Sequence, residues 1–558
     1  MTTKRAFLSS LLINIFFLVL CLVFGNLIFG ATDDYFMARL LEGVYGEGYN
    51  VHLTFVNVLY GYALLPLYHL FPKIGWYYVG EMVGVFLSFT TIGFVLIKKV
   101  KSLWGPILAA LFTAAFASDC YLSVQFTQCA AIFAATGMLL FVLFSCLTSN
   151  FSEKKRIFLL IASIFFIFWG AIMRSEAFLM GTPFFALALI SNLRSCWFNK
   201  NWVLIGVTIV LVGLFSIQWI DKKHYESADY KYYKDFQSAR ATIGDGTFFD
   251  EAGVSDDLDE IGYYGEDLHL LRNWIFNDRE VFSVDSLNMY IKYLNSNKRE
   301  SSRKSIFQSF FIALSCAAGK PMFWIWFLFC ATIATSRKGA CYAWGSIVII
   351  SVLTCILILV SRVVFRVELG FWLYATVLSI PYIGNLPKIS NRIQYCILGI
   401  ILVSSLVVFY RTGDIVRNQT NGRAMSTTAK PLKHYDEALA YIRSLPSNQI
   451  ALTSHIPYMF FVQKMNPPYL SEPYGNWKKI IPIGYWTPFF PDIEKHLHSI
   501  GINNPLKDVT KDNVIVVSNG QLADYLQRHY NVEVDVTTIR SFDGLNFYKY
   551  SIKSPEIP

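Results

Sequence analysis

Charged residues are scarce in this chain, at 16% of 558 residues, whereas soluble domains carry about 25%. The sequence has no P-loop, GxGxxG, HExxH or GxSxG motif, which argues against a nucleotide-driven pump and a zinc hydrolase. The nine histidines have no metal-ligand spacing. The ten cysteines form no CxxC pair, so they indicate small packing residues rather than a disulfide framework.

Hydrophobic residues are abundant instead, at 54% of the chain, and the mean hydropathy is +0.41. A helix that crosses a bilayer needs about 20 apolar residues. The net charge of +9 comes mostly from short loops between apolar runs, where Lys and Arg set orientation, so it does not indicate nucleic-acid binding. The sequence predicts a polytopic α-helical membrane protein with about eleven transmembrane helices, near 6–30, 77–97, 104–118, 124–147, 157–172, 176–193, 202–220, 320–336, 342–361, 367–386 and 393–410.

Two domains follow from this pattern: a transmembrane domain over 1–410 and a small extracytoplasmic α/β domain over 411–558. The first domain carries outer loops at 31–76 and 221–304. In the second we expect helices near 434–445 and 520–530, and strands at 513–517 and near 532–549. Residues 303–318 form a further interfacial helix in this interpretation.

Residues 52–73 are ambiguous, because they are apolar enough to cross the membrane but contain polar and aromatic side chains. If they cross, Lys98, Lys99 and Lys101 lie outside. If they lie in the interface as an amphipathic helix, those lysines lie inside with the basic residues of the other short loops. We therefore expect the second arrangement, with a cytoplasmic N-terminus.

An acidic pair, Asp33 and Asp34, directly follows the first span. The segment from Tyr35 to Val44 resembles an amphipathic helix at the membrane surface, which places both aspartates in its first turn. There they could simply stabilise the helix N-terminus. Alternatively, an Asp at this place can take a proton from a sugar hydroxyl as a general base.

Basic side chains follow at two later places on the expected outer face. Arg174 and Glu176 stand in a tight turn between two spans, where Arg174 can hold a phosphate oxygen or pair with the glutamate to cap the helix ends. Arg362 and Arg366 are spaced four residues apart near the outer end of the 342–361 span, which predicts that they share one face of a helix. They suit a phosphate on a lipid carrier, or they extend to lipid headgroups.

Three more candidates are polar residues of the outer loops. Asp119 lies in an outward turn, with Gln125 and Gln128 after it; these could line a cavity or make helix–helix hydrogen bonds. Arg240 and Asp267 belong to the acidic loop 221–304, which either covers a site or is a solvated surface.

The first span, the acidic pair, the outer helix and a second span ending in Lys98–Lys99 together resemble the GT-C superfamily of integral membrane glycosyltransferases. The likeness is to its bacterial branch that uses polyprenyl-phosphate sugars. It covers 1–200 well and 201–410 loosely, and only residues 64–67 come near the family's Pro-Pro-Leu element. It implies a GT-C-like fold in the bacterial inner membrane, with the C-terminal domain outside the cytoplasm.

The resemblance implies inverting transfer of a sugar from a polyprenyl-phosphate donor to an envelope glycan, lipid or protein acceptor. Asp33 or Asp34 would then be catalytic, and Arg174, Arg362 and Arg366 would hold the donor phosphate. Family members either work without a metal or hold a divalent cation such as Mg²⁺ or Mn²⁺ on the acidic pair, and both alternatives stay open. Competing hypotheses are an O-antigen-type polymerase or ligase, a lipid or glycan transporter, and a non-catalytic envelope protein.

Overall fold

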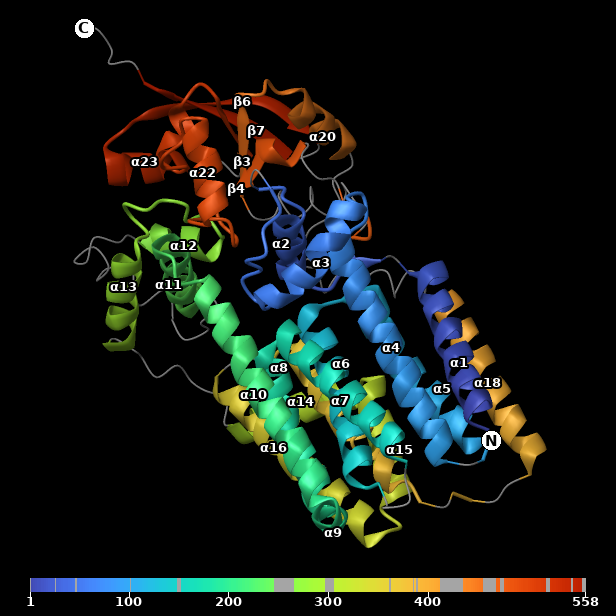
Figure 1. Cartoon of the computed structure of the whole chain (residues 1–558). Coiled ribbons are helices and arrows are strands. Elements are labelled where there is room, and N and C mark those ends of the chain that lie inside the picture. The colour runs from blue at the N-terminus through green and yellow to red at the C-terminus, as the bar shows by residue number, and fades with distance from the viewer. Residues whose placement is uncertain are drawn as a thin grey trace, which may run out of the picture.

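Long apolar helices run side by side through the lower part of the molecule (Figure 1). The computed structural model describes residues 2–25, 27–45, 48–100, 102–147, 152–244, 265–296, 306–360, 363–384, 386–387, 390–411, 435–454, 468–471, 476–517, 522–542 and 545–553. The helices of this bundle are α1 (Thr3–Phe24), α4 (Trp76–Lys99), α5 (Trp104–Ala117), α6 (Phe126–Ser145), α7 (Glu153–Met173), α8 (Ser175–Ser191), α9 (Leu193–Phe198), α10 (Lys200–His224), α14 (Ile306–Ala318), α15 (Pro321–Ile333), α16 (Arg337–Leu359), α17 (Phe365–Val377) and α18 (Asn391–Arg411).

The chain is a multi-span helical membrane protein. Within the described residues, eight helices are long and apolar enough to cross a membrane, or nine if the bent pair α14–α15 is one span. All eleven expected segments contain helix, but α8 is short, α15 meets α14 at 87°, and α17 has 13 residues. By length and composition the count is therefore eight or nine rather than eleven.

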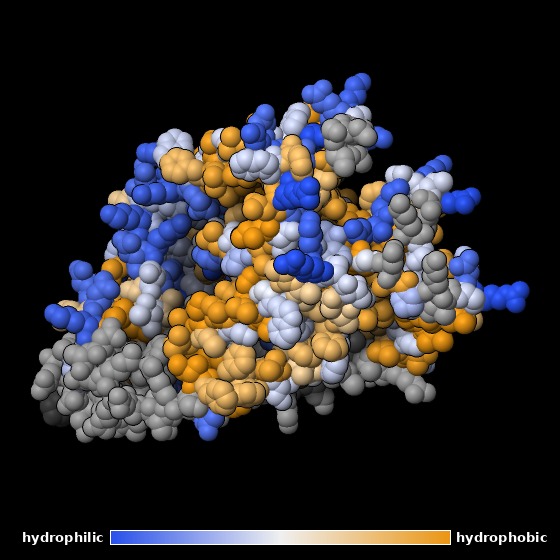
Figure 2. Space-filling model, turned by 90° about the horizontal axis from the view of Figure 1, so that it is seen from below, coloured by the Kyte–Doolittle hydropathy of each residue, from blue (hydrophilic) through white to orange (hydrophobic). Residues whose placement is uncertain are grey.

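Helices α1 and α4 run antiparallel, and this decides the course of the first loop. Lys98, in the last turn of α4, donates to the Thr3 hydroxyl at the start of α1, at 3.2 Å. Residues between the two helices therefore begin and end on the same side of the bundle. Residues 52–73 do not cross, as predicted; they form the 13-residue helix α3 (Val58–Leu70). Figure 2 views the opposite end of the bundle, where hydrophilic side chains stand among hydrophobic ones.

The centre of the bundle is α6, of which all but one residue is buried. It packs closely on α7 because glycines face the partner backbone: a Cβ on Gly137 would overlap the Ile167 amide, and one on Gly170 would overlap the Ala134 amide. Small residues at such crossings let apolar helices approach without a hydrophobic driving force. All ten cysteines are free thiols, as the absence of paired motifs predicts.

Above the bundle lies a second part of the molecule, which we call the head (Figure 1). It contains α2 (Thr32–Leu41), α3, α11 (Ala228–Gly244), α12 (Gly265–Arg272), α13 (Val284–Ser296) and the C-terminal region from residue 435 onward. The C-terminal region has helices α20 (Tyr435–Ser444), α22 (Pro491–Ser499) and α23 (Leu522–Tyr530), and strands β3 (Ile450–Thr453), β4 (Ile480–Pro482), β5 (Val514–Val517), β6 (Val534–Phe542) and β7 (Leu545–Ile552).

These strands form one mixed sheet in the order β4-β3-β5-β7-β6. Strands β3, β4 and β5 are parallel, and β7 joins β5 and β6 antiparallel. Every residue of β3 and β5 is buried, as expected for parallel strands covered on both faces. The helices and strands predicted near 434–445, 513–517, 520–530 and 532–549 are confirmed; β3, β4 and α22 were not predicted.

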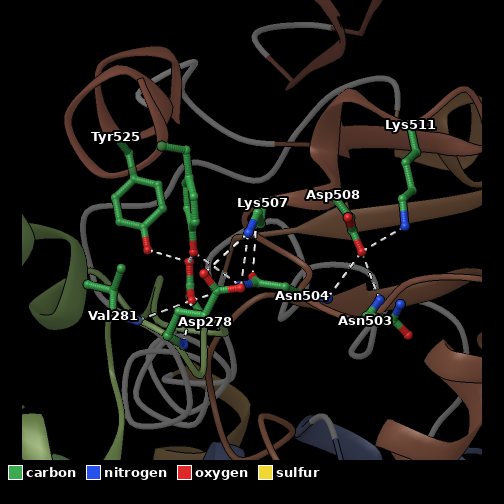
Figure 3. Close-up of polar contacts among 10 residues, drawn as sticks. Asp278, Val281, Asn503, Asn504, Lys507, Asp508, Lys511 and Tyr525 are labelled. Atoms are coloured by element: carbon green, nitrogen blue, oxygen red, sulfur yellow. Dashed lines mark hydrogen bonds and ion pairs between the residues drawn. The ribbon is translucent and has the colours of Figure 1, made fainter. Parts of the chain in front are cut away.

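Residues 265–296 are hydrogen-bonded to the C-terminal region around Asp278 (Figure 3). This fully buried carboxylate accepts hydrogen bonds from the Tyr525 hydroxyl at 2.7 Å and the Tyr530 hydroxyl at 2.5 Å. It also accepts from the Asn504 amide at 2.8 Å. Nearby, the Ile483 carbonyl accepts from two successive backbone N–H groups of the 265–296 segment. The two stretches therefore pack as one unit, and Asp278 lies 226 to 252 residues from these side-chain partners in the sequence.

The prediction of an amphipathic surface helix after the acidic pair is wrong. Helix α2 is buried over every residue from Asp34 to Leu41. Its polar residue Arg39 pairs with Glu42 at 2.5 Å inside the protein, with side chains 3% and 2% exposed. The head covers the face that the sequence pattern assigned to solvent. The acidic pair thus opens a buried helix.

Candidate active site

A two-residue parallel ladder places the acidic pair at the top of the bundle. Strand β1 (Ile28–Phe29) pairs with β2 (Ser123–Val124), which directly precedes α6. Gly30 is required here, because a Cβ would overlap the Ser123 carbonyl oxygen. Helix α2 begins two residues later with Asp33 and Asp34 in its first turn. Carboxylates are favourable at this end of a helix because of its dipole.

The two aspartates have different surroundings. Asp34 is fully buried, and its Oδ1 accepts from the Tyr77 hydroxyl and the Phe126 N–H, both at 3.1 Å. Burial raises the pKa of the Asp34 carboxyl well above its usual range, and the neighbouring Asp33 adds to this. A buried acid with two such donors is suited to holding α2 against α4 and α6.

Asp33 instead faces a cavity. It is half-buried, and its Oδ1 accepts from the indole Nε1–H of Trp486 at 2.9 Å. The cavity has a volume of about 700 Å³, within the range of small-molecule sites. Its wall comes from the first loop, the α7–α8 junction, α11, α17 and the C-terminal region; the polar and aromatic members include Asp33, Thr54, Phe55, Phe126, Thr127, Arg174, Glu176, Tyr233, Lys234, Gln237, Trp274, Arg366 and Trp486.

Three basic side chains share this wall with Asp33. Arg174 caps the junction of α7 and α8 and pairs with Glu176 at 2.9 Å. Its guanidinium also lies over the Phe126 ring, 5.3 Å from the centroid. Arg366 stands in the first turn of α17 and interacts electrostatically with Asp34. Asp33, Arg174, Glu176 and Arg366, which are all candidates from the sequence, therefore line one cavity.

Lys234, on α11, is the third base of the cavity, and the sequence did not single it out. Its ammonium lies 3.4 Å from the centre of the Tyr225 ring and 3.8 Å from Asp221. Burial lowers the pKa of Lys234, while the Asp221 carboxylate opposes this effect. In the sequence Lys234 is one of several basic residues in a loop that is also rich in acidic and aromatic residues, and this pattern does not indicate the direction of its side chain.

The other candidates lie elsewhere. Asp267 is buried and bonds His529 at 2.9 Å, so it joins α12 to α23. Asp119 lies in the π-helical turn Ser118–Leu122 and is not among the residues lining the cavity. Arg240 is 1% exposed and lies behind the wall.

The predicted helical pairing of Arg362 and Arg366 is wrong, because α16 ends at Leu359 and α17 begins only at Phe365. Arg362 itself falls outside the described residues, so its role stays a prediction. Arg366 stands in the first turn of α17 and lines the cavity.

Left-handed backbone gathers at this cavity. Thr54 and Trp274 line the cavity and have φ of 60° and 59°. Tyr485, directly before Trp486, has φ of 70°, and Phe489, three residues after Trp486, has φ of 62°. For residues other than glycine this conformation costs on the order of 1–3 kcal/mol each and persists only where surrounding contacts enforce it. The concentration at one place agrees with a functional site.

An apolar groove of about 430 Å³ lies beside the cavity, between α14, α15, α16 and α17. Leu357 of α16 lines both spaces. The groove walls are almost wholly aliphatic and aromatic; they include Phe310, Leu314, Phe323, Trp326, Ile350, Phe371 and Trp372. Glu368 is the one charged residue of the lining and pairs with Lys320 at 2.5 Å.

The acidic pair does not form a two-carboxylate ligand set facing the cavity, because Asp34 is buried away from it. Among the residues the structure describes, no group of three or more His, Cys, Asp and Glu side chains is arranged to hold a metal ion. Dependence on a divalent cation stays a prediction, which transfer assays with and without a chelator would test.

Comparison with known proteins gives structural likeness only. No protein-family model and no curated protein sequence matches the chain. Its structure is similar to the Archaeoglobus fulgidus oligosaccharyltransferase, at TM-score 0.44 and 12% identity, over 100% of this chain and 75% of that one. It is also similar to ArnT from Cupriavidus metallidurans bound to undecaprenyl phosphate, at TM-score 0.41 and 11% identity, over 98% of both chains. Apo ArnT gives TM-score 0.42 and 12% identity, over 96% of this chain and 97% of that one.

Proposed function

We propose that this protein is a membrane glycosyltransferase that transfers a sugar from a polyprenyl-phosphate donor to a hydroxyl of an envelope glycan, lipid or protein. The observation that carries the proposal is the cavity itself, where the Asp33 carboxylate shares a wall with Arg174, Lys234 and Arg366. A base and a cluster of cations are what transfer from a phosphate leaving group needs.

In the proposed reaction Asp33 accepts the proton of the acceptor hydroxyl. The hydroxyl oxygen forms a bond to the anomeric carbon while the bond from that carbon to the phosphate oxygen breaks. Attack opposite the leaving group inverts the anomeric centre, and polyprenyl phosphate leaves with the bonding electrons. Arg366 and Lys234 neutralise its growing charge, and Arg174 contributes although Glu176 already pairs with it.

The adjoining groove favours a lipid-linked donor over a soluble sugar phosphate. An isoprenoid chain needs an apolar surface at membrane depth, and the groove provides one between apolar helices. Leu357 borders both spaces, so one donor molecule could place its phosphate in the cavity and its isoprenoid chain in the groove. We expect Leu357→Trp to raise KM for long-chain donors more than for short-chain donors. Val352→Trp, at a 52% exposed position of the same helix, is the control.

In this proposal the protein lies in a bacterial inner membrane, with the head on the extracytoplasmic side. Lys98 and the N-terminus lie together at the opposite end of the bundle, and basic residues near membrane helices favour the cytoplasmic side. Reporter fusions after Lys101 and Gly413 should report the cytoplasm and the outside, respectively. The reverse result would put the cavity on the wrong side for envelope acceptors.

Envelope glycan profiling tests the reaction. Strains carrying wild type, a deletion, Asp33→Asn or Asp34→Asn are compared, with protein levels measured in each. We expect one sugar to disappear in the deletion and in Asp33→Asn, because loss of a general base costs about 10²–10⁴-fold in rate. Asp34→Asn keeps an acceptor oxygen for Tyr77 and should retain the sugar. The opposite pattern would make Asp34 the base, and an unchanged profile in the deletion would favour a transporter.

Donor binding provides a test that does not require the acceptor. Arg366→Gln should weaken binding of a polyprenyl phosphate to the purified protein, because a guanidinium facing the cavity is lost. Arg337→Gln removes an exposed charge at the start of α16, far along that helix from the cavity, and is the control. Equal affinities of both variants and wild type would contradict the assignment of the phosphate site.

A further inference from the structure

The dipeptide Tyr485–Trp486 of the C-terminal region holds the first turn of α2. Trp486 donates its indole N–H to Asp33 Oδ1 at 2.9 Å, across 453 residues of sequence. Tyr485 donates its hydroxyl to the backbone carbonyl oxygen of Thr32. Consecutive residues therefore contact both the backbone of this turn and the carboxylate that faces the cavity.

Trp486 is itself held from several sides. Its backbone carbonyl accepts from the Tyr233 hydroxyl of α11 at 2.9 Å. The guanidinium of Arg240 lies 4.4 Å from the Trp486 ring centroid and 4.4 Å from the Trp274 ring centroid. The two indole rings meet edge to face, with centroids 5.7 Å apart. Phe55 also packs edge-on against the Trp486 ring, with centroids 4.6 Å apart. A buried cation over an aromatic ring is a strong contact, and together these contacts fix the direction of the indole N–H.

We propose that Trp486 is a positioning residue of the active site, which orients the Asp33 carboxylate and makes the C-terminal region part of the catalytic centre. This inference rests on the proposed function, in which Asp33 is the general base. A hydrogen bond to an ionised carboxylate favours the ionised form, and a bond to a charged group is roughly twice as strong as a neutral one. The indole also restricts the rotation of the carboxylate, which keeps one orientation toward the acceptor hydroxyl.

Trp486→Phe tests the role, because phenylalanine keeps an aromatic face over Arg240 but has no N–H. The measurement is the pH profile of sugar transfer by the full-length protein in nanodiscs, with a polyprenyl-phosphate sugar as donor. We expect the acidic limb of this profile to move to higher pH, because the ionised carboxylate loses a hydrogen-bond donor. The midpoint of this limb does not depend on how much folded protein a preparation contains, so partial misfolding cannot imitate the shift.

The remaining titratable and charged groups around Asp33 are unchanged in this variant. They are Asp34 on the same helix, Arg174 and Glu176 at the α7–α8 junction, Tyr233 and Lys234 on α11, and Arg366 on α17. Trp274→Phe is the matched control, because it alters the second indole ring that contacts Arg240. An equal shift of the acidic limb in both variants, or no shift in Trp486→Phe, would overturn the proposal.

A substrate-free measurement separates this inference from the proposed function. In a double-mutant cycle on stability, Trp486→Phe and Asp33→Ala should be non-additive, and the coupling between Trp274→Phe and Asp33→Ala should be smaller, because Trp274 packs on the Trp486 ring. Additive effects for the first pair would overturn the positioning contact even if the wild type transfers sugar. A wild type that transfers no lipid-linked sugar would overturn the proposed function and the catalytic role of Trp486, while the cycle still reports the contact.

Discussion

Replacing Arg39 by methionine would remove one member of a buried ion pair and leave the other charged. Arg39 Nη1 lies 2.5 Å from Glu42 Oε2, and the two side chains are 3% and 2% exposed. Breaking a buried pair by removing one partner costs about 3–5 kcal/mol, because the buried Glu42 carboxylate loses a charged contact. Methionine keeps an unbranched apolar stem but lacks the guanidinium group, so the lost packing of that group adds to this cost.

The double variant Arg39→Met/Glu42→Met removes both charges and should recover most of the loss, since well-packed apolar replacements of buried pairs are often neutral. The assay is denaturant unfolding of the purified protein in nanodiscs, followed by tryptophan fluorescence. A single substitution that costs less than about 1 kcal/mol would match an exposed pair and would refute the buried position of α2. A double variant that costs the sum of both singles would refute the pairing itself.

Three further predictions concern Asp34, Gly484 and Asp278. Burial raises the pKa of the Asp34 carboxyl in the folded protein. The wild type should therefore lose stability relative to Asp34→Asn as the pH rises from about 3.9, the pKa in the unfolded state, toward the pKa in the folded state. A stability difference that stays constant between pH 4 and 8 in unfolding experiments would contradict this. Gly484→Ala should destabilise the head by about 1–3 kcal/mol, because its Cβ would overlap the Trp274 carbonyl oxygen, whereas Gly399→Ala, with nothing within 4 Å, should not destabilise the protein. Asp278→Asn replaces either Oδ2, which accepts from both Tyr525 and Tyr530, or Oδ1, which accepts from Asn504. Hydrogen exchange in 265–296 should therefore speed up by about tenfold or more. The exposed Asp285→Asn on α13 is the control, and equal exchange in both variants would contradict the role of the buried carboxylate.

Local features of the sequence predicted the helices well. Apolar runs such as the one that forms α10 need no partner to be recognised, because the length of apolar chain that crosses a bilayer is fixed. The same reasoning failed for α2, where the spacing of Arg39 and Glu42 suggested a solvent-facing side. It also joined Arg362 and Arg366 into one helix, although α16 ends before both. Periodicity does not show whether another part of the chain covers a polar side.

For the candidate site, too, the sequence could indicate some residues and not others. Asp33, Arg174 and Arg366 could be selected from the sequence, because charged residues beside apolar spans are costly and therefore informative. Lys234 and Trp486 could not, since both come from head segments whose residue types are common in loops. The sequence also could not separate the roles of two adjacent aspartates.

By itself the sequence determined that this chain spans a membrane several times and carries an acidic pair after its first span, because hydropathy and charge are properties of short segments. The tertiary structure alone decided that Asp33 faces a cavity and Asp34 is buried, and that Trp486 reaches Asp33 from 453 residues away. Contacts of this kind arise where distant segments pack against one another, and their partners are chosen by the shape of the folded head rather than by any local pattern.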